Sequence, residues 1–195
     1  MKIVAATGNQ GKVKEIKAIL GELGIEVISQ KELGLDIDVP ENGSTFLENA
    51  FIKARTISRL ANMPAIADDS GLCVDALGGK PGIYSARYAG EDATDRDRMD
   101  KLLGELKNEK DRSAHFTSAI AFVVSENEEY SAEGHVYGSI LHEVDGEGGF
   151  GYDPIFYCDE LKKSFGKASA EEKNKVSHRY NALIALKKIL QKKNI

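Results

Sequence analysis

The chain has 195 residues, enough for one domain, and it is 42% hydrophobic and 29% charged, as in ordinary globular proteins. Its 26 Lys and Arg residues and 31 Asp and Glu residues give a net charge of −5, which argues against binding of nucleic-acid polymers or anionic membranes through excess positive charge. No apolar run approaches the roughly 20 residues that span a bilayer, and the N-terminus lacks a signal-peptide pattern. We therefore expect a cytoplasmic protein with no membrane partner. Cys73 and Cys158 match no metal-binding spacing, so we expect buried free thiols.

The first quarter of the chain alternates strand and helix patterns. Hydrophobic periodicity predicts a strand at 2–6, a helix at 11–23, a strand at 25–29 and a polar loop at 30–43. Thr45 then starts a second helix, since Glu48 lies three residues on, as in a capping box.

The next part of the chain is rich in acidic residues and glycine. A short strand at 64–67 runs into the acidic turn 68–71, and residues 72–74 are extended again. The glycine-rich segment 75–93 has little periodicity, and a loop of this length inside a domain is usually functional. Thr94 caps a third helix.

The second half begins with two segments rich in β-branched and aromatic residues, which predict a long hairpin. The expected elements are hairpin strands at 114–125 and 130–139, a glycine turn leading into a strand at 146–157, and a final helix at 177–192. Ser169 and Glu172 form a capping box before that helix. Together the patterns predict an α/β protein with an extended mixed sheet flanked by helices.

A glycine turn with a lysine, TGNQGK at 7–12, joins the first strand to the first helix. A P-loop has the pattern G-x-x-x-x-G-K-[ST], whereas Gly8 and Gly11 are separated by only two residues and Val13 follows Lys12. The turn is therefore no P-loop. It still resembles an anion site, because a helix N-terminus favours negative charge.

Asp68 and Asp69, within ADDSG, form the strongest acidic signal. Adjacent carboxylates at a strand end repel each other unless a cation neutralises them, and Mg²⁺ typically takes one or two carboxylates plus substrate phosphates. A solvated acidic turn is the alternative. Glu41 is a second candidate ligand if its loop folds back onto Asp69.

Positive groups occur at four places: Lys12, Lys53, Lys173 and the pair His178-Arg179. Each alone is most often a surface charge. Two cations at the start of a helix add to its dipole, which is unfavourable unless an anion binds. In an acidic protein this gathering suggests a polyphosphate ligand.

The segment GGFGYDP at 148–154 combines glycines, two aromatic rings and a carboxylate. Glycines permit a flat ligand to approach the backbone. Phe150 or Tyr152 could stack on a base, and Asp153 could accept from ring N–H groups. A tight turn with core aromatic residues is the alternative.

Six segments together resemble one family, the inosine triphosphate pyrophosphatases, which act on noncanonical purine nucleoside triphosphates, and the bacterial type fits best. The matching segments are TGNQGK at 7–12, ENA at 48–50 with Lys53, ADDSGL at 67–72, LGGKPGIYSARYAG at 77–90, GGFGYDPIF at 148–156 and EEKNKVSHR at 171–179. They occur in order over nearly the whole chain, which is far more specific than any single motif. The loop at 36–42 matches least clearly.

The resemblance implies that residues 1–195 form a single pyrophosphatase domain, elongated, with two lobes around a central nucleotide-binding cleft. It implies a homodimer that requires Mg²⁺ and hydrolyses ITP, dITP and XTP to the monophosphate and pyrophosphate. The catalytic carboxylate of the family corresponds to Asp69. The implied substrate-binding residues are Thr7, Gly8, Asn9, Gln10, Gly11, Lys12, Ser70, Phe150, Gly151, Tyr152, Asp153, Lys173, His178 and Arg179.

The chemistry of the residues agrees with this function. We expect Mg²⁺ at Asp69 with Glu41 and Asp68, and Asp69 as the base that deprotonates the attacking water. Attack at the α-phosphorus makes pyrophosphate the leaving group, whose charge the lysines Lys12, Lys53 and Lys173 stabilise. Donors such as Arg179 or His178 near the 6-oxo group would favour hypoxanthine and xanthine over adenine.

Two other functions use the same residues. A nucleotide sensor would keep the anion site without turnover, but it needs no carboxylate pair to activate water. A phosphotransferase would need an acceptor site and a complete phosphate loop, which the short turn at 7–12 does not provide.

Overall fold

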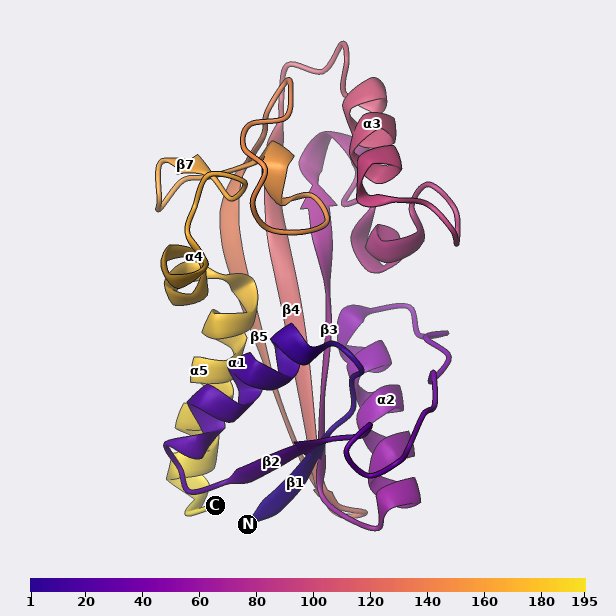
Figure 1. The fold of residues 1–195 in the computed structure, drawn as a ribbon, viewed down its shortest axis with the longest axis vertical. Coiled ribbons are helices and arrows are strands. Elements are labelled where there is room, and N and C mark those ends of the chain that lie inside the picture. The colour runs from indigo at the N-terminus through magenta and orange to yellow at the C-terminus, as the bar shows by residue number, and fades with distance from the viewer. The chain divides into compact units, whose positions relative to one another are not determined.

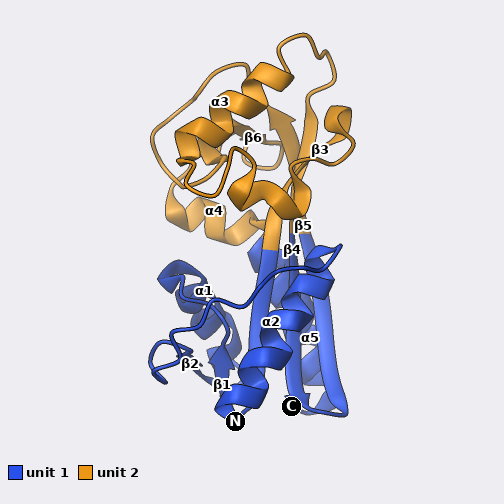
Figure 2. Cartoon of the chain, turned by 90° about the vertical axis from the view of Figure 1, so that its right-hand side faces the viewer, with its two compact units in different colours: residues 1–69, 118–134, 179–195 blue, residues 70–117, 135–178 orange.

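The structure, a computed structural model, describes residues 1–195, and its chain divides into two compact units (Figure 2). Unit 1 comprises Met1–Asp69, Ser118–Gly134 and Arg179–Ile195, and unit 2 comprises Ser70–Thr117 and His135–His178. Three strands, β3, β4 and β5, contribute residues to both units. The assignment of residues 1–195 to one pyrophosphatase domain stays a prediction, as does the arrangement around a cleft.

Seven strands are hydrogen-bonded in the order β2-β1-β3-β4-β5-β6-β7. Their bounds are β1 Lys2–Ala5, β2 Glu26–Ser29, β3 Ala65–Val74, β4 Ser113–Ser125, β5 Glu128–Ile140, β6 Phe156–Cys158 and β7 Lys163–Ser164. β1 pairs in parallel with β2 and β3, whereas β6 is antiparallel to β5 and β7. The predicted mixed sheet is confirmed.

Five α-helices and three short 3₁₀ helices accompany these strands. The α-helices are α1 Gln10–Gly21, α2 Phe46–Ala61, α3 Asp95–Glu105, α4 Ala170–Val176 and α5 His178–Lys193, and the 3₁₀ helices are Asp75–Leu77, Gly82–Arg87 and Asp153–Ile155. The segment 75–93, expected to be a loop, thus contains two of the 3₁₀ helices. None of the helices has the length and apolarity of a bilayer span.

The predicted helix caps are present, with one correction. Ser169 and Glu172 form the expected capping box before α4. Thr45 accepts the Glu48 N–H at the start of α2, but the Glu48 carboxylate accepts the N–H and hydroxyl of Ser44 at 2.6 and 2.7 Å. The reciprocal bond therefore goes to the residue before the N-cap. Cys158 is a buried free thiol as expected, whereas Cys73 is half-buried.

The expected acidic turn at 68–71 is wrong, because β3 continues through it as one ten-residue strand. This strand lies between β1 and β4, so most of its residues are buried despite their turn-forming types. Successive side chains of a strand point to opposite faces. Asp68 and Asp69 therefore face opposite sides of the sheet.

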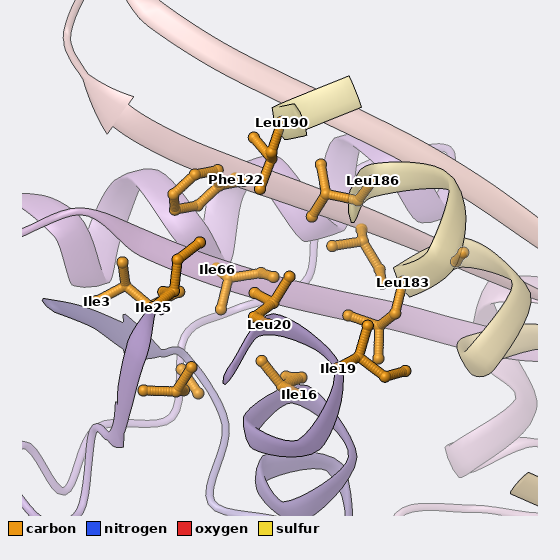
Figure 3. Close-up of a cluster of buried hydrophobic side chains, with 14 of the residues drawn as sticks. Ile3, Ile16, Ile19, Leu20, Ile25, Ile66, Phe122, Leu183, Leu186 and Leu190 are labelled. Carbon is orange, nitrogen blue, oxygen red and sulfur yellow. The ribbon is translucent and has the colours of Figure 1, made fainter. Parts of the chain in front are cut away.

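Unit 1 has helices on both faces of its strands (Figure 1), and a cluster of buried hydrophobic side chains lies on each face. On one face α1 and α5 pack against Ile66 and Phe122 (Figure 3). On the other face α2 packs against Ala65 and Ala67. The alternation along β3 is thus already visible in its apolar residues, and Asp68 continues the face of Ile66.

Unit 2 has a core that is rich in aromatic rings. The ring centroid of Phe116 lies 4.8 Å from that of Phe156 and 6.2 Å from that of Phe165. His178 stacks on Phe116 with ring centroids 5.0 Å apart and planes inclined by 16°. This packing fixes the imidazole ring, because aromatic contacts favour defined geometries.

The pairing of β5 with β6 leaves no room for a side chain at Gly138. A Cβ atom there would overlap the carbonyl oxygen of Tyr157. We expect Gly138→Ala to lower the free energy of unfolding by about 2 kcal/mol, because the two strands must move apart. Gly104→Ala in α3 is the control, since a Cβ atom there contacts nothing and alanine favours helix by about 1 kcal/mol. Equal effects in urea unfolding would contradict the predicted steric clash.

Candidate active site

A cavity of about 330 Å³ in unit 1 lies beyond the carboxyl end of β1. Ligands of α/β sheets commonly bind in the crevice at the carboxyl ends of the strands. The loop 36–41 and the turn after β1 form part of its wall. The predicted site residues among those that line it are Thr7, Gly8, Lys12, Glu41, Lys53 and Asp68.

Asn9 organises the turn at the start of α1. Its side chain accepts the Lys12 N–H at 3.2 Å, and its own N–H donates to the Thr7 hydroxyl at 3.1 Å. Gln10 and Gly11 are the first residues of the helix. The carboxamide of Asn9 thus shapes a short turn at a helix N-terminus, without the long glycine cradle of a P-loop.

Asp68 is the centre of a buried ionic network on the face of α1 and α5. Its Oδ2 atom lies 2.6 Å from Lys12 Nζ and 3.3 Å from Arg179 Nε. The Ser118 hydroxyl donates to Oδ1, and a second carboxylate, Glu15, accepts from Arg179 Nη1 at 3.2 Å. The side chains of Asp68 and Arg179 are 1% and 5% exposed, so these charges depend on one another.

This network changes two expectations from the sequence. Burial opposes the charge of Asp68, but Lys12 and Arg179 outweigh it and hold the pKa of the carboxyl well below its usual range. Three donors occupy the Asp68 carboxylate, which disfavours its expected role as a metal ligand. The Arg179 charge at the start of α5 is offset by Asp68 and Glu15, so it does not require an external anion.

Asp69 lies on the opposite face, beside α2. Lys53 Nζ is 3.1 Å from Asp69 Oδ1 and 2.5 Å from Glu41 Oε1, and it also donates to the Asp68 carbonyl at 3.0 Å. Asn49 donates to Asp69 Oδ2 at 3.2 Å and accepts the Gly43 N–H at 2.8 Å. The loop that carries Glu41 therefore folds back toward Asp69, and the two carboxylates share one ammonium group.

The sequence did not reveal the contribution of Asn49, which is completely buried. The ENA motif was the available signal, because an amide buried within a helix needs partners for its polar atoms. Asn49 uses them to join the Glu41 loop to Asp69.

Burial raises the pKa of Asp69, with a further increase from Glu41, although Lys53 opposes both. The pKa of Lys53 is raised despite its burial, because Asp69 and Glu41 stabilise its charge. No cluster of three or more His, Cys, Asp or Glu side chains is placed to hold a metal ion by itself. Glu41 and Asp69 nevertheless suit Mg²⁺, which needs only one or two carboxylates when substrate phosphates supply further oxygens.

Unit 2 holds the glycine-rich turn 148–153. Phe150 is 58% exposed, whereas Tyr152 is 4% exposed and donates its hydroxyl to the Ser85 carbonyl at 2.8 Å. Of the two aromatic residues proposed to stack on a base, Phe150 is thus the one with a ring at the surface. Tyr152 belongs to the core, as the alternative interpretation expected for the aromatic residues.

The Asp153 carboxylate is already engaged within this turn. Its Oδ2 atom accepts the Phe150 N–H at 2.9 Å and lies 2.5 Å from Lys173 Nζ. The same ammonium lies 4.4 Å from the Phe150 ring centroid. Asp153 therefore anchors the turn and Lys173, and this geometry disfavours its expected use as an acceptor for base N–H groups.

The predicted residues thus form two groups, one in each unit. Unit 1 brings together the 7–12 turn, Glu41, Lys53, Asp68, Asp69 and Arg179. Unit 2 contains Ser70, the 150–153 turn, Lys173 and His178, of which Phe150, Asp153 and Lys173 contact one another.

The sequence profile of the Ham1 family matches residues 3–189. The chain belongs to the Ham1 family. It is 47% identical over 190 residues to a dITP/XTP pyrophosphatase of Bacillus subtilis, covering 96% of each chain, and 50% identical over 185 residues to that of Desulfotalea psychrophila, covering 95% of this chain and 83% of that one.

Solved structures of the Ham1 family share the fold. The Staphylococcus aureus Ham1 protein matches with a TM-score of 0.91 and 45% identity, covering 99% of this chain and 100% of that one. A HAM1 protein from Coxiella burnetii matches with a TM-score of 0.93 and 42% identity, covering 98% and 99%. These matches confirm the family resemblance and the mixed α/β fold.

Removal of the Asp68 charge should destabilise the protein. We expect Asp68→Asn to lower the free energy of unfolding by about 3 kcal/mol at pH 7, because Lys12 and Arg179 lose their buried counter-ion. The folded pKa of Asp68 is depressed, so its contribution is full above the unfolded pKa of about 3.9 and is lost as pH falls toward the folded value.

Urea unfolding between pH 7 and pH 2.5 would measure this contribution. The difference between the wild type and Asp68→Asn should shrink below about pH 4. Asp100→Asn, which breaks an exposed pair with Arg96, serves as the control and should change the free energy by less than about 0.5 kcal/mol. A difference that stays constant with pH would mean that Asp68 is not ionised in the folded protein.

Proposed function

We propose that this Ham1-family chain is a nucleoside-triphosphate pyrophosphatase that hydrolyses ITP, dITP and XTP to the monophosphate and pyrophosphate, and so removes deaminated purines from the nucleotide pool. Relatives named dITP/XTP pyrophosphatase support this function at 47–50% identity. The observation that carries it is the pairing of Glu41 and Asp69 on Lys53, next to the turn at the start of α1.

The triphosphate would bind in the cavity of unit 1. The turn Thr7–Lys12 offers backbone N–H groups at a helix N-terminus, where negative charge is favoured. Lys12 and Lys53 both line the cavity and supply positive charge. A triphosphate has enough negative charge to make use of both ammonium groups and a metal ion.

Glu41 and Asp69 are the residues that would hold Mg²⁺. When bound, the ion supplies Lewis-acid polarisation of the phosphate oxygens. Asp68 would serve differently, by keeping Lys12 and Arg179 charged and in place.

Asp69 is the general base in this proposal. Asn49 and Lys53 hold its two carboxylate oxygens, so the carboxylate is oriented before the substrate binds. It takes the proton from a water molecule whose oxygen bonds to the α-phosphorus, while the bond from the α-phosphorus to the bridging oxygen of pyrophosphate breaks. Lys12 and Lys53 stabilise the charge that develops on the phosphate oxygens.

The base would stack on the exposed ring of Phe150, with Lys173 and the 150–153 backbone beside it. Ser70 would contact the nucleotide from β3. His178 and Arg179 would donate to the 6-oxo group, which adenine lacks, so that ATP leaves these donors unpaired. The fixed imidazole ring on Phe116 suits a directional contact of this kind.

We further propose that the enzyme is a cytoplasmic homodimer that acts on free nucleotides. The net charge of −5 supports a free nucleotide as the substrate in preference to a nucleic-acid polymer. Magnesium as the physiological ion belongs to the same proposal.

Hydrolysis in ¹⁸O-labelled water tests the reaction directly. ITP, dITP, XTP, GTP and ATP are incubated with Mg²⁺ or with EDTA, and the products are separated for mass analysis. We expect pyrophosphate from ITP, dITP and XTP only, with the label in the monophosphate. A label in pyrophosphate would place attack at the β-phosphorus, and orthophosphate with a nucleoside diphosphate would place it at the γ-phosphorus. Binding of ITP without any product would favour a sensor.

Asp69→Asn tests the assigned base. The amide keeps the size of the side chain but cannot accept the proton, so we expect kcat for dITP to fall by about 10³-fold. Calorimetric binding of the monophosphate product should stay within about tenfold of the wild type, since the phosphate turn and Phe150 are unchanged. Asp100→Asn is the control, because it removes an acidic group that forms only an exposed pair with Arg96. Full turnover in Asp69→Asn would exclude Asp69 as the base.

A further inference from the structure

We propose that Asp95 is a positioning residue for the nucleotide base, because it fixes the turn that presents Phe150. The inference rests on the proposed function, in which Phe150 stacks on the base. Asp95 is the first residue of α3, more than 50 positions before that turn in the sequence, and no sequence motif connected the two.

The Asp95 carboxylate links the helix to the turn through both of its oxygens. Oδ2 accepts the Gly151 N–H at 2.7 Å, and Oδ1 accepts from Arg98 Nη1 at 2.6 Å. Arg98 is itself held by a bond from Nη2 to the Ala93 carbonyl at 2.7 Å. The carboxylate therefore has little freedom to leave Gly151, and the bond is charge-assisted.

A second carboxylate holds the adjacent peptide. Asp153 accepts the Phe150 N–H at 2.9 Å, and its own N–H donates to the Phe150 carbonyl at 3.2 Å. Gly149 and Gly151 have φ angles of +77° and +62°, a region that glycine adopts without strain. Two carboxylates from separate segments thus fix the turn at Phe150, whose ring is exposed, and at Gly151.

This arrangement has a consequence for base binding. Because the N–H groups of Phe150 and Gly151 both point to carboxylates, neither is free to donate to a base. The turn then contributes a stacking surface. The affinity gained from stacking depends on how well the Phe150 ring is held before the ligand binds. A mobile turn would have to be ordered when the ligand binds, and this ordering costs free energy. A turn that is already fixed avoids that cost.

Asp95 has a simpler possible role, as a negative charge in the first turn of α3 that favours the helix dipole. Asp97 lies in the same helical turn, so a variant at Asp97 can distinguish the two roles. Its carboxylate accepts the Thr94 N–H at 2.8 Å and the Thr94 hydroxyl at 2.6 Å in a capping box, and it has no bond to the 148–153 turn. Loss of Asp97 weakens the same helix without releasing Gly151.

The test compares Asp95→Ala, Asp95→Asn and Asp97→Ala in steady-state hydrolysis of dITP. We expect Asp95→Ala to raise KM about tenfold with kcat within about twofold, because a charge-assisted bond that orders the turn is lost before chemistry. Asp95→Asn keeps an oxygen that can accept the Gly151 N–H, so its KM should lie between those of the wild type and Asp95→Ala. Asp97→Ala should lower the midpoint of thermal unfolding but leave KM within about twofold.

A second readout needs no substrate. The chain contains no tryptophan, so Phe150→Trp places a single reporter on the turn. In that background, fluorescence anisotropy decay should show faster local motion of the indole with Asp95→Ala than with Asp97→Ala. If Asp95→Ala does not fold, Asp95→Asn gives the same comparison with a smaller expected difference.

Equal KM values and equal anisotropy decays for the Asp95 and Asp97 variants would overturn the positioning role. If wild-type protein failed to hydrolyse dITP, ITP and XTP, the proposed function would be wrong, but the anisotropy comparison would still decide whether Asp95 holds the turn. Faster motion without a rise in KM would show that Asp95 orders the turn and that base binding does not use this order.

Discussion

The candidate site in unit 1 depends on the ion pairs that the buried Asp68 carboxylate forms with Lys12 and Arg179. The carboxylate meets Lys12 from α1, Arg179 from α5 and Ser118 from β4, so one side chain fixes the start of two helices against β3. A buried ion network is weak evidence for net stability, but removal of one member leaves the others uncompensated. The network specifies geometry, because it holds Lys12, and with it the turn at the start of α1, in one position.

The alternation of side chains along β3 separates Asp69 from this network. Asp69 belongs to the face of α2, where it and Glu41 share the ammonium group of Lys53. One positive charge between two carboxylates leaves that group with an excess of negative charge, which favours an additional cation. The environments of these two adjacent aspartates therefore differ. Lys12 and Arg179 hold the pKa of Asp68 well below its usual range, whereas burial raises the pKa of Asp69, which shares its one cation with Glu41.

Local sequence signals were sufficient for the helices and for the class of the sheet. Thr94 and Ser169 cap their helices as expected, since capping depends only on residues a few positions apart. The prediction of a turn at 68–71 is wrong, because Asp, Ser and Gly favour turns and only the pairing of β3 with the strands on either side overrides that preference. No local pattern marks Asn49 or Asp95 for a related reason: their hydrogen-bond partners lie 20 and 56 positions away.

In the proposed function, the unit 2 turn bears on how the enzyme would discriminate between bases. Lys173, anchored by Asp153, covers one face of the Phe150 ring and leaves the ring otherwise exposed. Stacking on an aromatic face is nearly independent of base identity, and the N–H groups beside the ring are directed to Asp95 and Asp153. If the base stacks on Phe150 as proposed, selection for a 6-oxo purine would not come from this surface. It would come from donors that meet the edge of the base, which is the task proposed for His178 and Arg179.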